Sequence, residues 1–128
     1  MASSPAFAAT PNISSNVLSA TADSSYTAPT HSVTVFTAGS SGSVINVVDF
    51  VGAGTTVAGV VQLYLYDGST YHAWISQLVT AVTPSTTQVP FYASQTFNSR
   101  FIKSAWSLVA TSFVASQLVN VIAFGEDL

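Results

Sequence analysis

The sequence predicts an all-β fold, an antiparallel β-sandwich or jelly roll of seven or eight strands that follows an extended N-terminal arm. Short runs rich in β-branched and aromatic residues recur at intervals of about 8–12 residues from residue 31 onward. Turn sequences rich in Gly, Pro, Ser and Asp separate these runs. No window carries the apolar period of an amphipathic helix, so we expect strands throughout.

The first thirty residues differ from the rest, so we divide the chain into an arm, 1–30, and a sandwich domain, 31–128. Prolines interrupt the arm, and its apolar residues stand singly without a sustained period. Because such residues cannot bury one another locally, we expect them to dock on a neighbouring subunit. A disordered tail, or a first strand with a loose leader, is the alternative interpretation. The residues expected at this assembly interface are Phe7, Ile13, Val17, Leu18 and Tyr26.

The sandwich domain divides into seven apolar runs that we expect to be strands. These runs cover residues 33–37, 43–51, 57–66, 71–81, 87–97, 106–113 and 118–124. Asp67-Gly68, flanked by alternating apolar residues, predicts a tight hairpin turn with a positive φ at Gly68. Pro90 indicates an edge strand or a bulge. The stretch 97–105 is expected to be a loop or a short irregular segment.

Charge is scarce in this chain. Charged residues make up 5% of it, against about 25% in a typical soluble domain, and polarity comes mainly from 20 Ser and 15 Thr. Hydroxyl groups can be buried against a partner at a modest desolvation cost, whereas a free monomer normally keeps surface charge. We therefore expect a homo-oligomer, preferably a trimer, with a charge-poor monomer as the alternative. Two basic residues are too few to bind nucleic acid or an anionic membrane surface.

Groups that support catalysis or metal binding are also scarce. The chain has no Cys, and its two histidines, His31 and His72, show no close ligand spacing, so we expect neither a metal nor another cofactor. The Gly-rich stretch 52–59 lacks the Lys and the following helix of a phosphate-binding loop. No Gly-x-Ser-x-Gly turn is present, and the one adjacent carboxylate pair, Glu126-Asp127, lies at the chain end. We therefore expect a protein that is not an enzyme.

Aromatic residues gather around the predicted hairpin. One interpretation is a stacking platform for a glycan or for a partner surface. The other is cross-strand pairing with half of the rings in the core. Solvent exposure of the rings distinguishes the two. The residues of this possible partner or glycan surface are Tyr64, Tyr66, Tyr71 and Trp74.

A pattern of turns and strands from Val33 to the C-terminus, roughly three quarters of the chain, gives a further indication. It comprises Thr37-Ala38-Gly39 with Gly42-Ser43, GTTVAGVVQLYLYDGSTY (54–71), LVTAVTPST (78–86) and NVIAFGEDL (120–128). In these segments the chain resembles the small virion-associated, capsid-decoration or cement-like β-sandwich proteins of tailed bacteriophages. It departs from them at Gln62, where relatives often have Arg, and at 103–105, where they have Pro-Ala-Gly.

This resemblance implies a structural virion protein, made in the host bacterial cytoplasm, that sits on the capsid surface. Its expected partners are the phage major capsid protein and further copies of itself, and its expected role is to stabilise the coat lattice. A tail or head-fibre module that binds a host-surface glycan is the alternative function.

Overall fold

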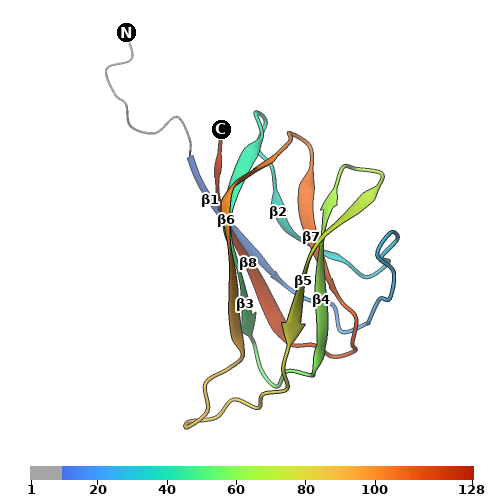
Figure 1. The fold of residues 1–128 in the computed structure, drawn as a ribbon, viewed down its shortest axis with the longest axis vertical. Coiled ribbons are helices and arrows are strands. Elements are labelled where there is room, and N and C mark those ends of the chain that lie inside the picture. Colours follow the sequence, from blue (N-terminus) through green and yellow to red (C-terminus); the bar gives the residue numbers. More distant parts are fainter. Residues whose placement is uncertain (1–9) are drawn as a thin grey trace.

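A computed structural model describes residues 10–128 and places eight strands in two four-stranded sheets packed face to face (Figure 1). The predicted all-β antiparallel sandwich is thus confirmed. The strands are β1 (Thr10–Val17), β2 (Val33–Thr37), β3 (Ser43–Gly52), β4 (Gly59–Tyr66), β5 (Tyr71–Val79), β6 (Tyr92–Ile102), β7 (Ser107–Ser112) and β8 (Val119–Asp127). Among the residues described, no helix is long and apolar enough to cross a membrane.

The strand order follows from one long antiparallel hairpin rolled into two layers. Sheet A has the order β1-β8-β3-β6 and sheet B the order β2-β7-β4-β5. The pairs β1–β8, β2–β7, β3–β6 and β4–β5 are the successive rungs of that hairpin, and all of them are antiparallel. Two further pairs join these rungs within each sheet, β3–β8 in sheet A and β4–β7 in sheet B. The first and last described strands, β1 and β8, therefore lie side by side in sheet A, with β1 at the edge and β8 beside β3 at the centre.

The core lies between the sheets and is built by the inward positions of each strand. Its largest fully buried apolar side chains come from both sheets and include Phe36, Ile45, Phe50, Leu63 and Leu108. Because successive strand residues point to opposite faces, these inward residues alternate with outward ones. This alternation decides which side chains remain on the outside of each sheet.

Side-chain amides link the two sheets along both lateral edges of the sandwich, where the edge strands lie. On one side, Asn12 and Asn16 of β1 donate to the main-chain carbonyls of Thr37 and Thr34 in β2, over 3.5 and 3.1 Å. On the other side, the Gln95 amide of β6 donates to a main-chain carbonyl of β5 over 3.2 Å. These contacts satisfy carbonyl groups on the edge strands β2 and β5, which a neighbouring chain could otherwise pair with.

The predicted boundary between an arm and a sandwich at residue 30 is wrong. Residues 10–17 form β1, which pairs with β8 from Thr10↔Asp127 to Val17↔Asn120. Leu18 enters the core, and the following residues, 19–32, pack across the outside of sheet B. The sequence misled because β1 turns polar side chains such as Asn12 and Asn16 inward. Residues 1–9 of the predicted arm lie outside the described residues.

The second correction concerns β6, which spans Tyr92–Ile102 where we expected a strand at 87–97 and a loop at 97–105. The ladder between β3 and β6 shifts between Ile45↔Arg100 and Val47↔Thr96. This bulge lets the strand continue through Ser99, whose φ is 57°. The polar residues around this bulge look like a turn when only the sequence is considered.

The hairpin prediction at Asp67-Gly68 is confirmed, with a φ of 103° at Gly68. The turn lies between the paired residues Tyr66 and Tyr71. Oδ1 of Asp67 accepts hydrogen bonds from the main-chain N–H groups of Ser69 and Thr70, at 2.9 and 2.8 Å. Asp favours this turn because its short carboxylate can accept such bonds from the following residues.

Candidate interaction surface

Within residues 10–128 no segment covers the outward side of sheet A, and we call this surface the open face. The ladders β1–β8–β3–β6 align its outward side chains in rows that run across the strands. The rows are Pro11–Glu126–Val44–Phe101, Ile13–Phe124–Val47–Thr96, Ser15–Ile122–Asp49–Ser94 and Val17–Asn120–Val51–Tyr92.

Apolar side chains occupy most positions of the open face. The outer side of a sandwich sheet normally carries polar residues, because only the inner side enters the core. Here the two central strands carry four outward apolar side chains, all of them half-buried. They are Ile122 and Phe124 of β8 and Val47 and Val51 of β3. Contiguous apolar surface of this kind marks a site of protein–protein contact.

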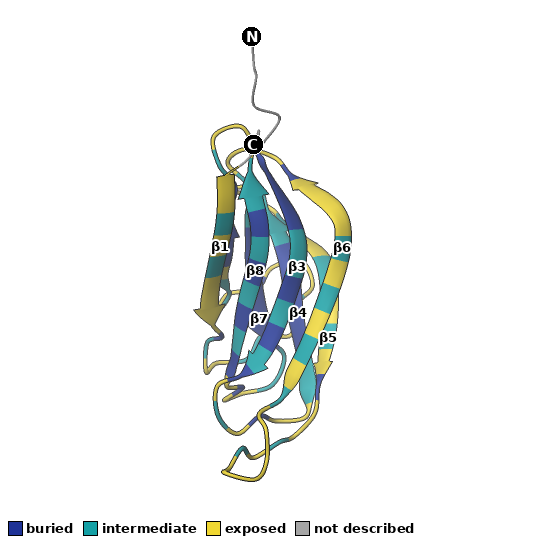
Figure 2. Ribbon diagram, turned by 90° about the vertical axis from the view of Figure 1, so that its left-hand side faces the viewer, coloured by how far each residue is buried: buried dark blue, intermediate teal, exposed yellow. Residues whose placement is uncertain are grey.

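The edges of the open face are the most exposed. Figure 2 shows its central strands in alternating buried and intermediate colours, flanked by the exposed strands β1 and β6. Ile13 on β1 is 63% exposed, and Tyr92 and Phe101 on β6 are 62% and 72% exposed. Large apolar side chains therefore stand at the margins of the face, where they can reach a partner.

A sequence signal for the open face exists, although we did not use it. The central strands β3 and β8 are apolar at both alternating phases, as in VINVVDFV (44–51). A near-continuous apolar run indicates a strand that is buried on both faces. In the structure only the inner face of each strand is covered, so the second apolar face lacks its partner among the described residues.

Two carboxylates are the charged groups of the open face. Asp49 accepts a hydrogen bond from the Ser94 hydroxyl at 2.6 Å, and Glu126 accepts one from the Asn46 amide at 3.2 Å. Neither carboxylate forms an ion pair among the residues described. A partner that covers this face must therefore leave these groups hydrated or bring a cation to them.

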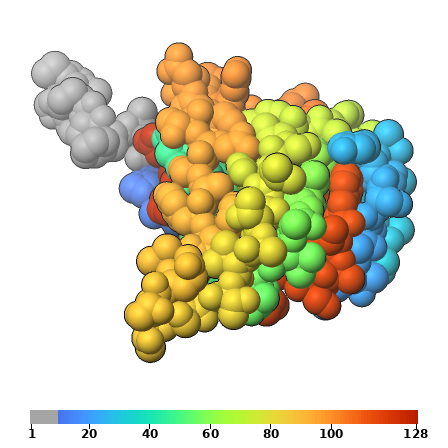
Figure 3. Space-filling view, turned by 60° about the horizontal axis from the view of Figure 1, so that its bottom comes forward, coloured from blue at the N-terminus to red at the C-terminus, as the bar shows by residue number. Residues whose placement is uncertain are grey.

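A protruding loop extends the open face at one corner. Residues 80–91 connect β5 to β6 and project from the body of the molecule (yellow to orange in Figure 3). Ser85 and Gln88 exchange main-chain hydrogen bonds at 2.9 and 3.4 Å, which shape its tip. Val89 is 75% exposed and lies close in sequence to Tyr92, the outermost residue of the last row. A connection of this length is frequently functional in compact domains.

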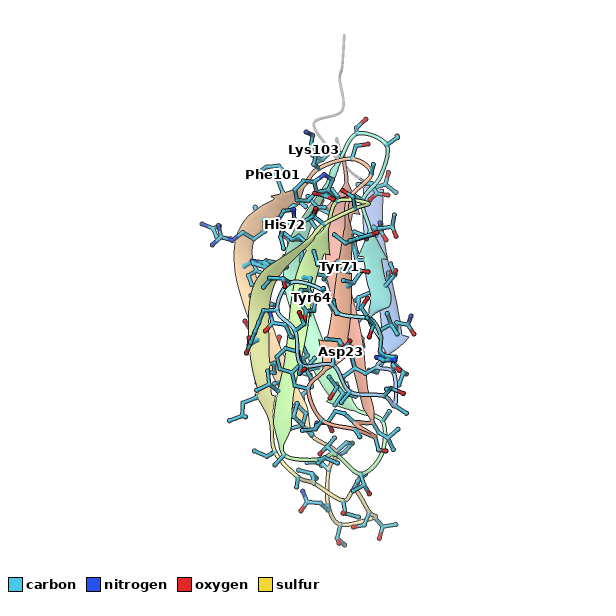
Figure 4. All side chains as sticks on the ribbon, turned by 90° about the vertical axis from the view of Figure 1, so that its right-hand side faces the viewer. Asp23, Tyr64, Tyr71, His72, Phe101 and Lys103 are labelled. Atoms are coloured by element: carbon cyan, nitrogen blue, oxygen red, sulfur yellow. The ribbon has the colours of Figure 1, made fainter. Side chains whose placement is uncertain are left out.

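The outside of sheet B differs, because the segment 19–32 covers it. The hydroxyl of Tyr64, a fully buried ring on β4, donates to the Ser25 carbonyl at 2.6 Å. Asp23 of the same segment accepts a 2.6 Å hydrogen bond from the Thr111 hydroxyl of β7. Figure 4 shows Asp23 and Tyr64 on this side of the molecule. Sheet B thus obtains from its own chain the cover that sheet A lacks.

The cover over sheet B is held by an ionised carboxylate. Burial raises the pKa of Asp23, but hydrogen bonds from Thr111, Thr30 and His31 outweigh burial and hold that pKa well below its usual range. The His31 ring contacts the same carboxylate at 3.1 Å. Burial, together with the Asp23 charge, raises the pKa of Tyr64 to about 12. Both shifts fit a structural role for this segment.

The predicted aromatic cluster is only partly assembled. Tyr66 and Tyr71 stack with ring centroids 4.3 Å apart, and Tyr64 meets Tyr71 edge-on at 5.9 Å. Tyr64, however, is fully buried, and the half-buried Trp74 packs against Phe97 at 4.9 Å. The interpretation as cross-strand and core packing therefore accounts for Tyr64 and Trp74, and two half-buried tyrosines remain at the surface.

A contact at the hairpin end was not expected from the sequence. The His72 ring stacks on Trp106 with centroids 5.4 Å apart, and its Nε2 lies 3.0 Å from Oδ2 of Asp67. Hydrogen bonds from the main chain of Thr70 and from His72 hold the pKa of Asp67 well below its usual range. Figure 4 places His72 at the same end of the molecule as Phe101 and Lys103. The distance in sequence between His72 and Trp106 concealed this contact.

The predicted assembly residues divide into three groups. Ile13 and Val17 lie on the open face, where both are exposed. Leu18 is buried in the core of its own chain, and Tyr26 meets Phe113 edge-on at 5.0 Å, so neither acts as an anchor on a free arm. Phe7 lies outside the described residues.

Metal-ligating side chains do not gather into a site within residues 10–128. No cluster of three or more metal-ligating side chains occurs there. His31 and His72 each contact a carboxylate from their own neighbourhood, Asp23 and Asp67.

Comparison with known proteins adds no relative to this description. No protein-family model, no curated protein and no solved structure matches the chain.

Proposed function

We propose that this chain is a non-enzymatic structural protein of a tailed-phage virion that binds the outer surface of the capsid and stabilises the coat lattice. The observation that carries the proposal is the open face, an uncovered apolar sheet surface on a chain whose charged residues make up only 5%. The resemblance in turn and strand pattern supplies the capsid context.

The fold is compatible with this role. We assign the rolled order of strands to the jelly-roll class, which includes viral capsid and lectin domains. Because one fold serves many functions, this assignment supports the proposal only together with the surface.

The size of the open face favours repeated binding over a lattice. Four strands about 4.8 Å apart and seven residues at about 3.4 Å each give a face of roughly 19 by 24 Å. That area is on the order of half of the ~800 Å² that each partner buries in a standard interface. One copy would therefore bind weakly, whereas copies joined to one another would bind a repeating surface with a much higher effective affinity. Binding to the assembled shell alone would then stabilise it by mass action.

Co-sedimentation with the shells of the phage that encodes this chain tests the proposal. The chain is expected to pellet with shells at a saturable occupancy and to raise their melting temperature. Phe124→Lys places a charge at the centre of the open face and should lower the apparent affinity by at least about tenfold, since a buried unpaired charge is costly. Thr34→Lys is the matched control, because Thr34 is exposed on β2 of the other sheet.

Two results would contradict the proposal. One is the absence of saturable binding to shells by the folded chain. The other is binding of Phe124→Lys that equals that of Thr34→Lys, provided that both variants melt near the wild-type temperature.

The glycan-binding alternative has less support. It requires exposed rings beside fixed polar groups, and Tyr64 is buried while Trp74 packs on Phe97. The half-buried stack of Tyr66 and Tyr71 remains. Binding of the chain to host-surface glycans, abolished by Tyr71→Ala, would favour this function over capsid binding.

A further inference from the structure

The backbone of β1 presents hydrogen-bonding groups outward from the edge of sheet A. Pairing with β8 follows a constant register, and Leu18 N donates to Val119 O at 3.1 Å, directly beyond the last pair. In an antiparallel ladder the residues bonded to the neighbouring strand alternate with residues whose N–H and C=O point away from it. The main-chain groups of the even-numbered residues of β1 therefore bond to β8. Those of the odd-numbered residues, 11 to 17, point away from β8 at the edge of the sheet.

The sequence of β1 agrees with this phase. Pro11, which has no N–H to donate, falls on an outward position, where a proline in an edge strand is tolerated. Val17 N, which also points away from β8, donates a hydrogen bond to Oδ1 of Asn16 in its own chain at 2.9 Å. The main-chain groups of Ile13 and Ser15 are left at the middle of the edge, and both residues are exposed.

Among the four edge strands that residues 10–128 form, β1 alone has an unbroken ladder. The other edge strands, β2, β5 and β6, each contain a register shift in their pairing. Bulges and charged residues are devices that prevent edge strands from pairing with other chains. β1 has no register shift and no charged residue. In Figure 2 it stands at the margin of sheet A, and no described strand lies beyond it.

We propose that β1 pairs antiparallel with β1 of a second copy of this chain, across a two-fold axis at Ser14. In this register Ile13 and Ser15 of each copy exchange main-chain hydrogen bonds with Ser15 and Ile13 of the other. Pro11 lies opposite Val17 of the second copy at each end of the new ladder, where Val17 N already donates to Asn16 of its own chain, so the missing N–H of Pro11 removes no central hydrogen bond. In a register shifted by one residue, main-chain groups that already bond to β8 would lie opposite main-chain groups that face the second copy, so no ladder would form.

The consequence is one continuous eight-stranded sheet in which the open faces of two copies join. This inference concerns self-association and does not depend on the capsid as the partner. It predicts a two-fold dimer in place of the trimer that the composition suggested. A single pair of strands covers less surface than a stable interface needs, so we expect a weak dimer in solution.

A cysteine at the two-fold axis tests the pairing, because the natural chain has no Cys. Directly opposed residues in a pair without mutual hydrogen bonds have Cα atoms about 4.5 Å apart, within the range of about 4.4–6.8 Å for a disulfide. Ser14→Cys should therefore form a disulfide-linked dimer under mild oxidation. The control is Ser41→Cys, at an exposed position between β2 and β3. Disulfide cross-linking of Ser14→Cys should be at least about tenfold faster than that of the control, because strand pairing raises the effective concentration of the two thiols.

A second variant tests whether backbone pairing causes the cross-linking. Ile13→Pro removes an outward N–H and leaves the β1–β8 ladder its hydrogen bonds, so in the Ser14→Cys background it should slow cross-linking at least fivefold. Thermal melting checks that this variant folds. Cross-linking of Ser14→Cys no faster than that of Ser41→Cys would overturn the proposal even if Ile13→Pro fails to fold. Undiminished cross-linking in a folded Ile13→Pro variant would overturn it too.

Discussion

Gly125 allows the two central strands of sheet A to approach each other, and its replacement should be severely destabilising. A Cβ added there would overlap the Val44 carbonyl oxygen and lie 3.2 and 3.4 Å from the Val44 carbonyl carbon and from Cα of Ile45. All of these are main-chain atoms of β3. Because β8 is hydrogen-bonded between β1 and β3, it cannot shift without weakening a ladder.

The magnitude follows from the kind of neighbour. Overpacking against flexible side chains typically costs about 1–3 kcal/mol, and here the neighbour is a paired backbone. We therefore expect Gly125→Ala to lower the free energy of unfolding by at least about 3 kcal/mol. For a domain of this size, this loss corresponds to a fall in melting temperature of about 10–15 °C.

Differential scanning calorimetry of Gly125→Ala and Gly68→Ala separates crowding from backbone strain. A Cβ on Gly68 meets nothing within 4 Å, but the φ of 103° disfavours any side chain. That strain is worth about 1–2 kcal/mol, so Gly68→Ala should melt only a few degrees below the wild type. A melting temperature of Gly125→Ala equal to or above that of Gly68→Ala would refute the crowding argument.

Three further predictions concern the segment over sheet B and the core. Burial, with the nearby Asp23 charge, raises the pKa of Tyr64 to about 12, so stability is lost as the pH rises above about 10, and alkaline melting curves of Tyr64→Phe should lack this loss. The pKa of Asp23 is lowered, so its stabilisation is present above about pH 4 and is lost below it. Asp23→Asn should therefore melt with a weaker acid dependence than the wild type. Leu18→Ala should cost about 2–5 kcal/mol in urea denaturation, because Leu18 is a core residue, whereas a free arm would tolerate it.

The sequence predicted the elements whose outward residues differ clearly from their inward ones or whose ends are marked by turns. The strands β2 to β5 lie close to their expected bounds, since Gly-rich turns and Asp67-Gly68 separate them. A strand within residues 1–30 was only the alternative to a free arm, because Asn12 and Asn16 of β1 face inward and make the links to β2. Hydrogen-bonded amides at the edge of a sandwich reverse the usual pattern, in which polar residues mark the outside.

The candidate surface was predictable only in part. Ile13 and Val17 were expected at an assembly interface, but as parts of a free arm. In the structure they lie exposed on the open face. The rows of the open face combine residues from both ends of the chain, as in Ile13–Phe124–Val47. Only the register between β1, β8 and β3 brings them together, and single-sequence patterns contain no information on which distant strands become neighbours.

The central position of β8 has a consequence for how this chain folds during synthesis. Among the eight described strands, β8 is synthesised last, and both β1 and β3 require it as a neighbour. The hairpin of β4 and β5 can form early from local contacts, whereas sheet A cannot form until β8 has left the ribosome. Until then β3 remains without its β8 neighbour, with apolar side chains on both of its faces. A chain that stalls before residue 119 would therefore expose an aggregation-prone strand, and truncation at the C-terminus should harm folding far more than its length suggests.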